Sequence, residues 1–126
     1  WSSDVCSSDL RLYPVANEKT IESLYQQCDI YLDNNKGNEL LNAVGRAFEN
    51  DMVIFATHDE AHNRMFTATE NIVRKKDINN LTVMLKKMSN SHKTYRTRLQ
   101  LQKNYANEIE HEKLINKINM SLKLKT

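Results

Sequence analysis

Two histidines four positions apart, His58 and His62, are residues whose type and spacing could do chemistry. On a helix this spacing would place both imidazole rings on one face, as in helical zinc pairs. A metalloprotease also needs a glutamate directly after the first histidine, and here that position is Asp59. No third ligand follows at a recognisable spacing. We therefore expect a polar loop here and no metal site.

A second polar group, Gly37, Asn38 and Glu39, stands at the expected start of a helix. Free backbone N–H groups at a helix start could receive a phosphate or a hydroxyl-rich ligand. One glycine does not make a phosphate-binding loop, so a helix cap without a ligand is the alternative. If residues 33–38 and 57–63 each follow a parallel strand, the two loops converge where open parallel sheets bind ligands.

The elements that position these loops follow from composition and hydrophobic periodicity. The chain has 126 residues, 40% of them hydrophobic, with only 2 Gly and 1 Pro, which indicates a single, mostly helical globular domain. We interpret residues 1–10, WSSDVCSSDL, as the translation of a sequencing-adapter oligonucleotide and exclude them from the fold. The remaining cysteine, Cys28, lies on an apolar helix face, which predicts a buried structural thiol.

Strand and helix patterns alternate in the first half of the chain. Extended runs lie near 12–13, 29–33 and 52–57, and stripes of helical period cover 17–28 and 38–50. This order is typical of right-handed crossovers in a parallel sheet. A complete doubly wound sheet needs further units of about 30 residues each. The predicted fold is therefore α/β, the C-terminal fragment of a Rossmann-like domain, followed by helices.

Charge divides the chain into two halves. Residues 11–70 carry 5 Lys/Arg against 10 Asp/Glu, a net of −5, whereas residues 71–126 carry 13 against 4, a net of +9. The basic residues alternate with apolar stripes and form no groove-reading motif, so nucleic acid is not an expected partner. Solvated helix faces are one interpretation of this charge, and weak contact with an anionic membrane surface is the other.

The basic half shows helical spacing and no convincing strand. We expect three helices there, with apolar positions at 78–88, 95–99 and 115–122. The predicted organisation is the end of an α/β domain over residues 11–76 and a helical segment packing on it over residues 77–126.

Several runs of the sequence together resemble a known family. They are LYP at 12–14, LYQQCDIYLD at 24–33, GNELLNAV at 37–44, RAFEN at 46–50, AHNR at 61–64 and ENI at 70–72. These runs resemble the C-terminal part of the accessory Sec-system glycosylation chaperones. Such proteins are non-catalytic partners that stabilise the O-GlcNAc transferase of serine-rich-repeat adhesins. Relatives usually carry Ile-Asn-His before Gly-Asn-Glu, where this chain has Asn34, Asn35 and Lys36.

The resemblance implies a GT-B architecture of two facing Rossmann-like domains, of which this chain holds the end of the second. It also implies a cytoplasmic hetero-oligomer with the catalytic subunit. The charge of the basic helices, and not the resemblance, adds a peripheral position at the inner face of the cell membrane as an expectation. The implied client is a Ser/Thr-rich polypeptide acceptor, and no cofactor is expected.

Two functions stay open: a non-catalytic stabilising and acceptor-binding subunit, and an active sugar-nucleotide-dependent transferase of the same fold. Active retaining enzymes of this architecture tend to carry two glutamates eight positions apart, where this chain has Asn38 and Arg46. This departure favours the non-catalytic subunit. We expect no catalytic residue, but an acceptor- or sugar-binding cleft formed by Asn35, Gly37, Asn38, Glu39, Asn42, Arg46, His62 and Asn63.

Overall fold

The computed structural model describes residues 17–34, 37, 42–58 and 61–125. The elements of the first half are α2 (Glu18–Gln27), β1 (Ile30–Asp33), α3 (Ala43–Glu49) and β2 (Val53–Thr57). They are followed by the short 3-10 helix η1 (Thr69–Asn71), β3 (Ile72–Val73), η2 (Lys75–Asp77), α4 (Ile78–Asn90) and α5 (His92–Lys125). The predicted strand near 12–13 and the predicted helical residues 38–41 lie outside the described residues.

The three strands form a parallel sheet in the order β1-β2-β3. Ile30 pairs with Val53 and Asp33 with Ala56, so both strands end at the same edge of the sheet. The predicted α/β fold with a parallel sheet and C-terminal helices is confirmed. The prediction that the basic half holds no strand was wrong, because β3 pairs with Ala56 and Thr57. With only two residues, β3 is too short for a period-two pattern to reveal it.

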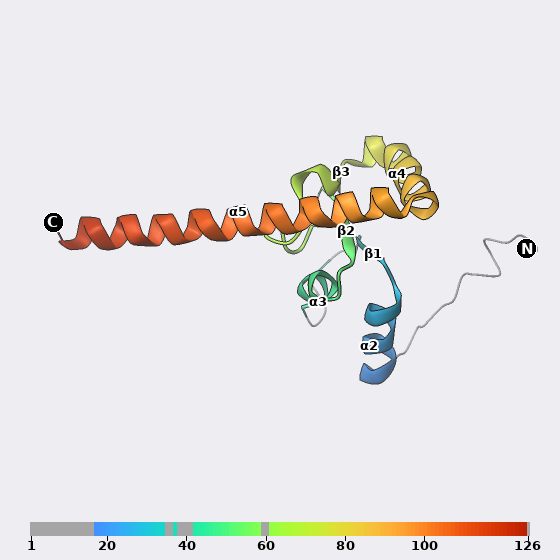
Figure 1. The fold of residues 1–126 in the computed structure, drawn as a ribbon, viewed down its shortest axis with the longest axis horizontal. Coiled ribbons are helices and arrows are strands. Elements are labelled where there is room, and N and C mark those ends of the chain that lie inside the picture. Colours follow the sequence, from blue (N-terminus) through green and yellow to red (C-terminus); the bar gives the residue numbers. More distant parts are fainter. Residues whose placement is uncertain (1–16, 35–36, 38–41, 59–60, 126) are drawn as a thin grey trace, which may run out of the picture.

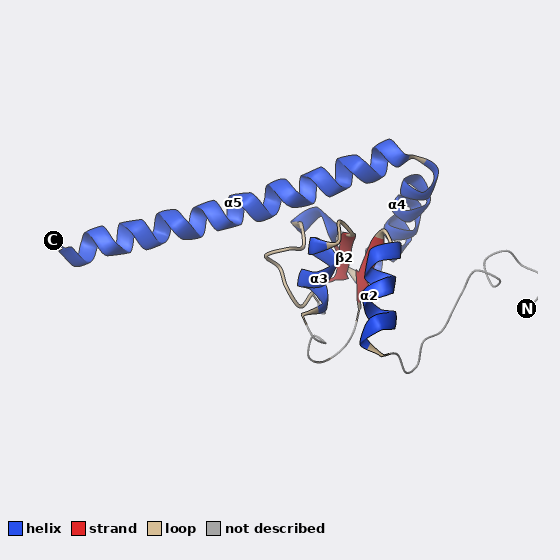
Figure 2. Ribbon diagram, turned by 60° about the horizontal axis from the view of Figure 1, so that its bottom comes forward, coloured by secondary structure: helices blue, strands red, loops and turns tan. Residues whose placement is uncertain are grey.

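The sheet lies between two helical layers (Figures 1 and 2), with α2 and α3 on one face and α4 and the first part of α5 on the other. All five residues of β2 are buried. Ile54 packs with the α3 side, whereas Val53 and Phe55 pack with Met88 of α4. A strand that is covered on both faces needs apolar residues throughout, which explains the continuous run from Met52 to Ala56.

A glutamine of α5 replaces a neighbouring strand along the first half of β2. The short β3 reaches only Ala56 and Thr57, so the backbone groups of β2 before them have no strand partner on that side. Gln102 is fully buried there. Its Nε2 donates to the carbonyl oxygen of Met52 at 2.8 Å, and its Oε1 accepts from the amide of Ile54 at 2.8 Å. The side-chain amide thus makes the two hydrogen bonds that a peptide group would make.

The expectation of three helices in the basic half was wrong. The stripes at 95–99 and 115–122 belong to one helix of 34 residues, α5. No Gly or Pro occurs between residues 92 and 125 to interrupt it. Figure 1 shows its C-terminal part extending away from the sheet, and beyond Ala106 nearly all its described side chains are exposed. Within the described residues, no helix is long and apolar enough to cross a membrane.

The N-terminal helix matches the sequence except at its end. Asn17 caps α2, with its side-chain oxygen accepting from the amide of Thr20 at 2.9 Å. The prediction of a buried thiol was wrong, because Cys28 is exposed and follows the helix as its C-cap. The apolar stripe reaches the sheet through Tyr25, which packs with the α3 core, and not through Cys28.

Candidate functional site

The candidate site lies at the carboxyl edge of the parallel sheet, where the loops after β1 and β2 meet. Asp33 ends β1 and is only 2% exposed. Thr57 ends β2, and its hydroxyl donates to the side-chain oxygen of Asn34 at 3.3 Å. The expectation that the two loops converge is met, because His62 of the second loop contacts both Asp33 and Gly37 of the first.

His62 joins the two loops through both nitrogens of its ring. Nδ1 lies 2.6 Å from Oδ1 of Asp33, and Nε2 lies 2.6 Å from the carbonyl oxygen of Gly37. Its backbone amide donates to the other carboxylate oxygen, Oδ2, at 2.8 Å. Both ring partners are acceptors, so both contacts are hydrogen bonds only when the imidazole carries two protons. In that form His62 is an ion-pair partner of Asp33.

The loop after β2 is held by further hydrogen bonds of its own. Asn63 accepts from the amide of Met65 through its side chain, at 3.2 Å, and from the Thr67 hydroxyl through its carbonyl, at 2.9 Å. Arg64 donates to the carbonyl oxygen of His58 at 2.8 Å. The predicted site residue Asn63 therefore shapes the loop with its amide oxygen, which leaves its side-chain NH₂ as the group that a ligand could use.

Arg46 of α3 is directed toward α2. Its Nη2 lies 2.7 Å from Oε1 of Glu18, and its guanidinium carbon lies 4.8 Å from the centre of the Tyr25 ring. The sequence analysis placed Arg46 among the cleft residues, and the structure gives it a salt bridge and a cation–π contact with another helix. Its positive charge is thus balanced by a carboxylate from α2.

At the start of α3 the side chain of Asn42 lies close to a glycine. Asn42 has a left-handed backbone, with φ of 55°, and is exposed. A Cβ on Gly45 would lie 2.6 Å from the side-chain oxygen of Asn42, so a larger residue there requires the exposed Asn42 side chain to move. Gly37 also has a positive φ, 106°, a conformation that glycine adopts without steric cost.

The predicted site residues thus fall into three groups. His62 and Gly37 are in direct contact, and Asn63 is next to His62. Asn42 and Arg46 belong to the start of α3, with Arg46 turned to α2. The residues Asn35, Asn38 and Glu39 lie outside the described part of the chain. Among the described residues, no group of three His, Cys, Asp or Glu side chains could hold a metal ion.

Sequence reasoning missed Asp33 as a site residue, although it placed the loop that starts there. The sequence did hold a signal for Asp33, because it is an acidic residue at the last position of a predicted strand, next to the predicted position of the His62 loop. Parallel pairing of β1 with β2 brings Asp33 to the edge from which the second loop leaves.

Comparison with known proteins identifies the family. Residues 5–102 match the family model of the GftB/GlyA-F C-terminal domain, a match that begins inside the segment 1–10 that we excluded. Similar relatives are the UDP-N-acetylglucosamine--peptide N-acetylglucosaminyltransferase stabilizing proteins GtfB of two streptococci. The Streptococcus pneumoniae serotype 4 protein is 33% identical over 84% of this chain, and the Streptococcus gordonii protein is 36% identical over 78%.

The similarity extends to a solved structure, the crystal structure of a GtfA/B complex bound to UDP and GlcNAc. Its matching chain is 35% identical, with a TM-score of 0.64 over 72% of this chain and 20% of that one. This chain spans 24% and 22% of the two streptococcal relatives. The matched model covers well over half of the residues, and the chain belongs to the GftB/GlyA-F C-terminal domain family.

Proposed function

We propose that the protein containing this chain is a non-catalytic subunit that stabilises a protein O-GlcNAc transferase. The relatives named above are stabilising proteins of such a transferase, and the similar solved chain belongs to a GtfA/B complex. The observation in this chain that carries the proposal is the closed set of contacts around Asp33. This buried carboxylate accepts from the ring and the backbone of His62.

A transferase that acts on a sugar nucleotide needs acceptor groups for the hydroxyls of the donor sugar. Asp33 is buried, and both of its oxygens are already engaged by His62. Arg46 stands where the resemblance places a carboxylate in active enzymes, and a guanidinium has no acceptor. Its charge is directed to Glu18. These contacts support a structural role for the carboxyl edge and not the binding of a sugar-nucleotide donor.

We further propose that the carboxyl edge binds a Ser/Thr-rich polypeptide acceptor, the serine-rich repeats of an adhesin handled by the accessory Sec system. The amide of Asn63 and that of the exposed Asn42 supply donors and acceptors suited to hydroxyl side chains and peptide groups. His62 would hold the two loops at a fixed separation. The proposed location is the cytoplasm, with the lysine-rich C-terminal half contacting an anionic membrane surface.

The test measures the elution volume of the catalytic subunit and the half-life of its activity, with and without the intact protein. We expect a co-eluting complex in size-exclusion chromatography and a longer half-life of transferase activity at a fixed temperature. An equal amount of an unrelated globular protein is the control for nonspecific protection. Separate elution of the two proteins together with an unchanged half-life would refute the stabilising role.

A further inference from the structure

The last part of α5 has an exposed apolar face. Beyond Ala106, which is buried, the helix extends away from the sheet (Figures 1 and 2). Four large apolar side chains lie on one side of this part, each between 43% and 58% exposed: Leu114, Ile115, Ile118 and Leu122. Residues three and four positions apart are neighbours on a helix surface, so these four form one continuous face. A patch of this kind indicates a contact with another polypeptide.

This apolar face points away from the sheet. With about 100° between successive residues, Ile118 lies about 160° around α5 from Gln102, which binds β2. On the side of Gln102, Nζ of Lys113 approaches Sδ of Met65 at 3.7 Å. Lys113 lies about 140° around the helix from Ile118. The domain thus approaches this part of α5 from the side opposite the apolar face and leaves that face exposed.

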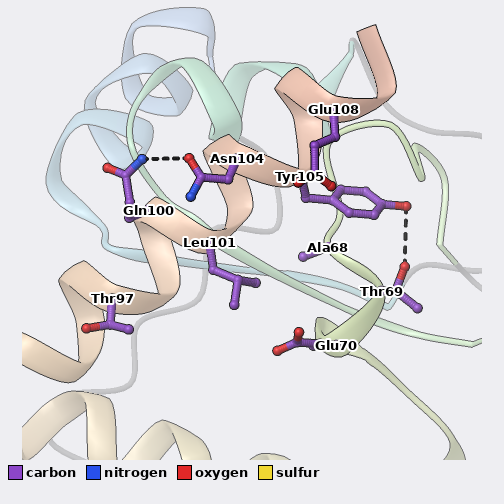
Figure 3. Close-up of a pocket in the computed structure, with 9 residues that line it drawn as sticks. All are labelled: Ala68, Thr69, Glu70, Thr97, Gln100, Leu101, Asn104, Tyr105 and Glu108. Carbon is purple, nitrogen blue, oxygen red and sulfur yellow. Dashed lines mark hydrogen bonds between the residues drawn. The ribbon is translucent and has the colours of Figure 1, made fainter. Parts of the chain in front are cut away.

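Nearer to the domain, the same row of residues is mostly polar. Alternating steps of four and three positions back from Ile115 lead to His111, Glu108, Asn104 and Leu101. The last three of these line a pocket of about 550 Å³ between η1 and α5, with Thr69 and Glu70 on its other side (Figure 3). The Thr69 hydroxyl donates to that of Tyr105 at 3.4 Å, so η1 contacts α5 here. The row becomes continuously apolar only where the domain no longer covers it.

Charge changes sign along the exposed part of α5. Three exposed carboxylates precede the apolar face: Glu108, Glu110 and Glu112. Three exposed lysines stand within it or follow it: Lys113, Lys117 and Lys123. Two such helices side by side in the same direction would bring like charges together, whereas in opposite directions the acidic part of each lies against the basic part of the other. The segment is therefore complementary to itself in the antiparallel orientation.

We propose that this face binds the same face of a second copy of the chain, with the two α5 helices antiparallel. A two-fold axis between residues 116 and 117 sets Ile115 of each helix against Ile118 of the other. The same axis sets His111 against Leu122. Apolar side chains that are exposed in one copy are then removed from water in the pair, which is the driving force for association.

The extent of the overlap follows from the same axis. Residues 108–125 of the two helices lie alongside each other over about 27 Å. The overlap ends close to Ala106, where α5 begins to pack on its own domain, so the two sheets lie at opposite ends of the pair. The lysine-rich end of each helix then reaches Glu108, beside the pocket that Glu70 also lines. A contact of about five helical turns buries less than the roughly 1,200 Å² of a stable interface, so we expect reversible pairing in the micromolar range.

The first experiment measures self-association of the intact protein by analytical ultracentrifugation across the micromolar range. Ile118→Asp places a charge in the apolar face, and Met120→Asp is the matched control. Met120 is 65% exposed and lies about 160° around the helix from Ile118. Loss of one buried isoleucine accounts for at least about tenfold, and a symmetric pair holds two, so we expect a dissociation constant about a hundredfold higher for Ile118→Asp. Met120→Asp should leave it unchanged.

Disulfide trapping tests the orientation of the pair. Chains with His111→Cys and chains with Leu122→Cys, both carrying Cys28→Ser, are mixed under mild oxidation, and mass spectrometry identifies the joined peptides. We expect bonds between position 111 of one chain and position 122 of the other, since the antiparallel pair keeps like positions about 16 Å apart, too far for a disulfide. A parallel pair would join like positions.

Each outcome decides the proposal. A protein that stays monomeric across the micromolar range overturns it, as does self-association that Ile118→Asp does not weaken or bonds between like positions. The catalytic subunit and anionic vesicles are added separately to the same variants. Binding of either that only Ile118→Asp weakens, in a protein that is monomeric alone, assigns the face to that partner and overturns the pairing. Transferase stabilisation that survives in Ile118→Asp would leave the proposed function standing.

Discussion

Replacing Gln102 by leucine tests how far one side chain supports the central strand. Gln102 is fully buried and makes two hydrogen bonds of 2.8 Å to backbone groups of Met52 and Ile54, which are themselves 4% and 0% exposed. Leucine fills much of the volume but leaves one carbonyl oxygen and one amide buried without partners. Each such group costs about 1–3 kcal/mol, so the expected loss is about 2–6 kcal/mol.

The assay is hydrogen–deuterium exchange of the segment that contains β2 in the intact protein. If exchange occurs through local opening, a loss of 2 kcal/mol raises the opening constant roughly 30-fold. Gln102→Glu separates hydrogen bonding from packing, because it keeps an acceptor for Ile54 and turns a second acceptor toward the carbonyl of Met52. We expect it to be at least as damaging as Gln102→Leu.

The matched control is Gln100→Leu, on the same helix but exposed. Its side chain donates to that of Asn104 on the helix surface, and exposed substitutions of this kind usually change stability by less than about 0.5 kcal/mol. Exchange rates in β2 that are the same for Gln102→Leu and Gln100→Leu would refute the reasoning that the side-chain amide replaces a strand.

Three further predictions follow from other contacts. His62→Ala removes the ring bonds to Asp33 and Gly37 and should lower the free energy of unfolding by about 1–3 kcal/mol in a denaturant titration, whereas exposed His111→Ala on α5 should not; equal effects would contradict the assignment. Burial raises the pKa of the Tyr95 hydroxyl above its usual value, and the nearby Asp29 and Asp51 raise it further. The contribution of Tyr95 to the free energy of unfolding is therefore present below about pH 10 and is lost as pH rises through the raised pKa. Tyr95→Phe should make the free energy of unfolding fall less steeply with rising alkaline pH; an unchanged slope would contradict this. Exposed Cys28 should be alkylated in the native protein by iodoacetamide, as mapped by mass spectrometry, and protection until unfolding would show that it is buried.

The sequence predicted those parts of the fold that depend on local pattern. Strands near 29–33 and 52–57 and the helix near 17–28 appear at Ile30–Asp33, Val53–Thr57 and Glu18–Gln27, because short apolar runs mark the strands and a stripe of helical period marks the helix. The parallel pairing of the two strands was expected from the intervening helix and is confirmed.

The features that were missed depend on contacts between distant residues. Nothing local marks Gln102 as a strand substitute, since its partners lie 48 and 50 positions away. The short β3 is a strand only because β2 lies beside it. At the site, the convergence of two loops was predictable from parallel topology, but the contact of His62 with Asp33 depends on the path of the second loop, which no periodicity describes.

The most direct test of the central claim is a sugar-transfer assay. The purified intact protein is incubated with UDP-N-acetylglucosamine and a Ser/Thr-rich repeat polypeptide, with and without the catalytic subunit, and the transferred sugar is measured by intact-mass spectrometry. We predict transfer only when the catalytic subunit is present, and longer-lasting transfer than by that subunit alone. Transfer by the protein alone that is abolished by Asn38→Ala or Arg46→Ala would show that it is an enzyme and contradict the account.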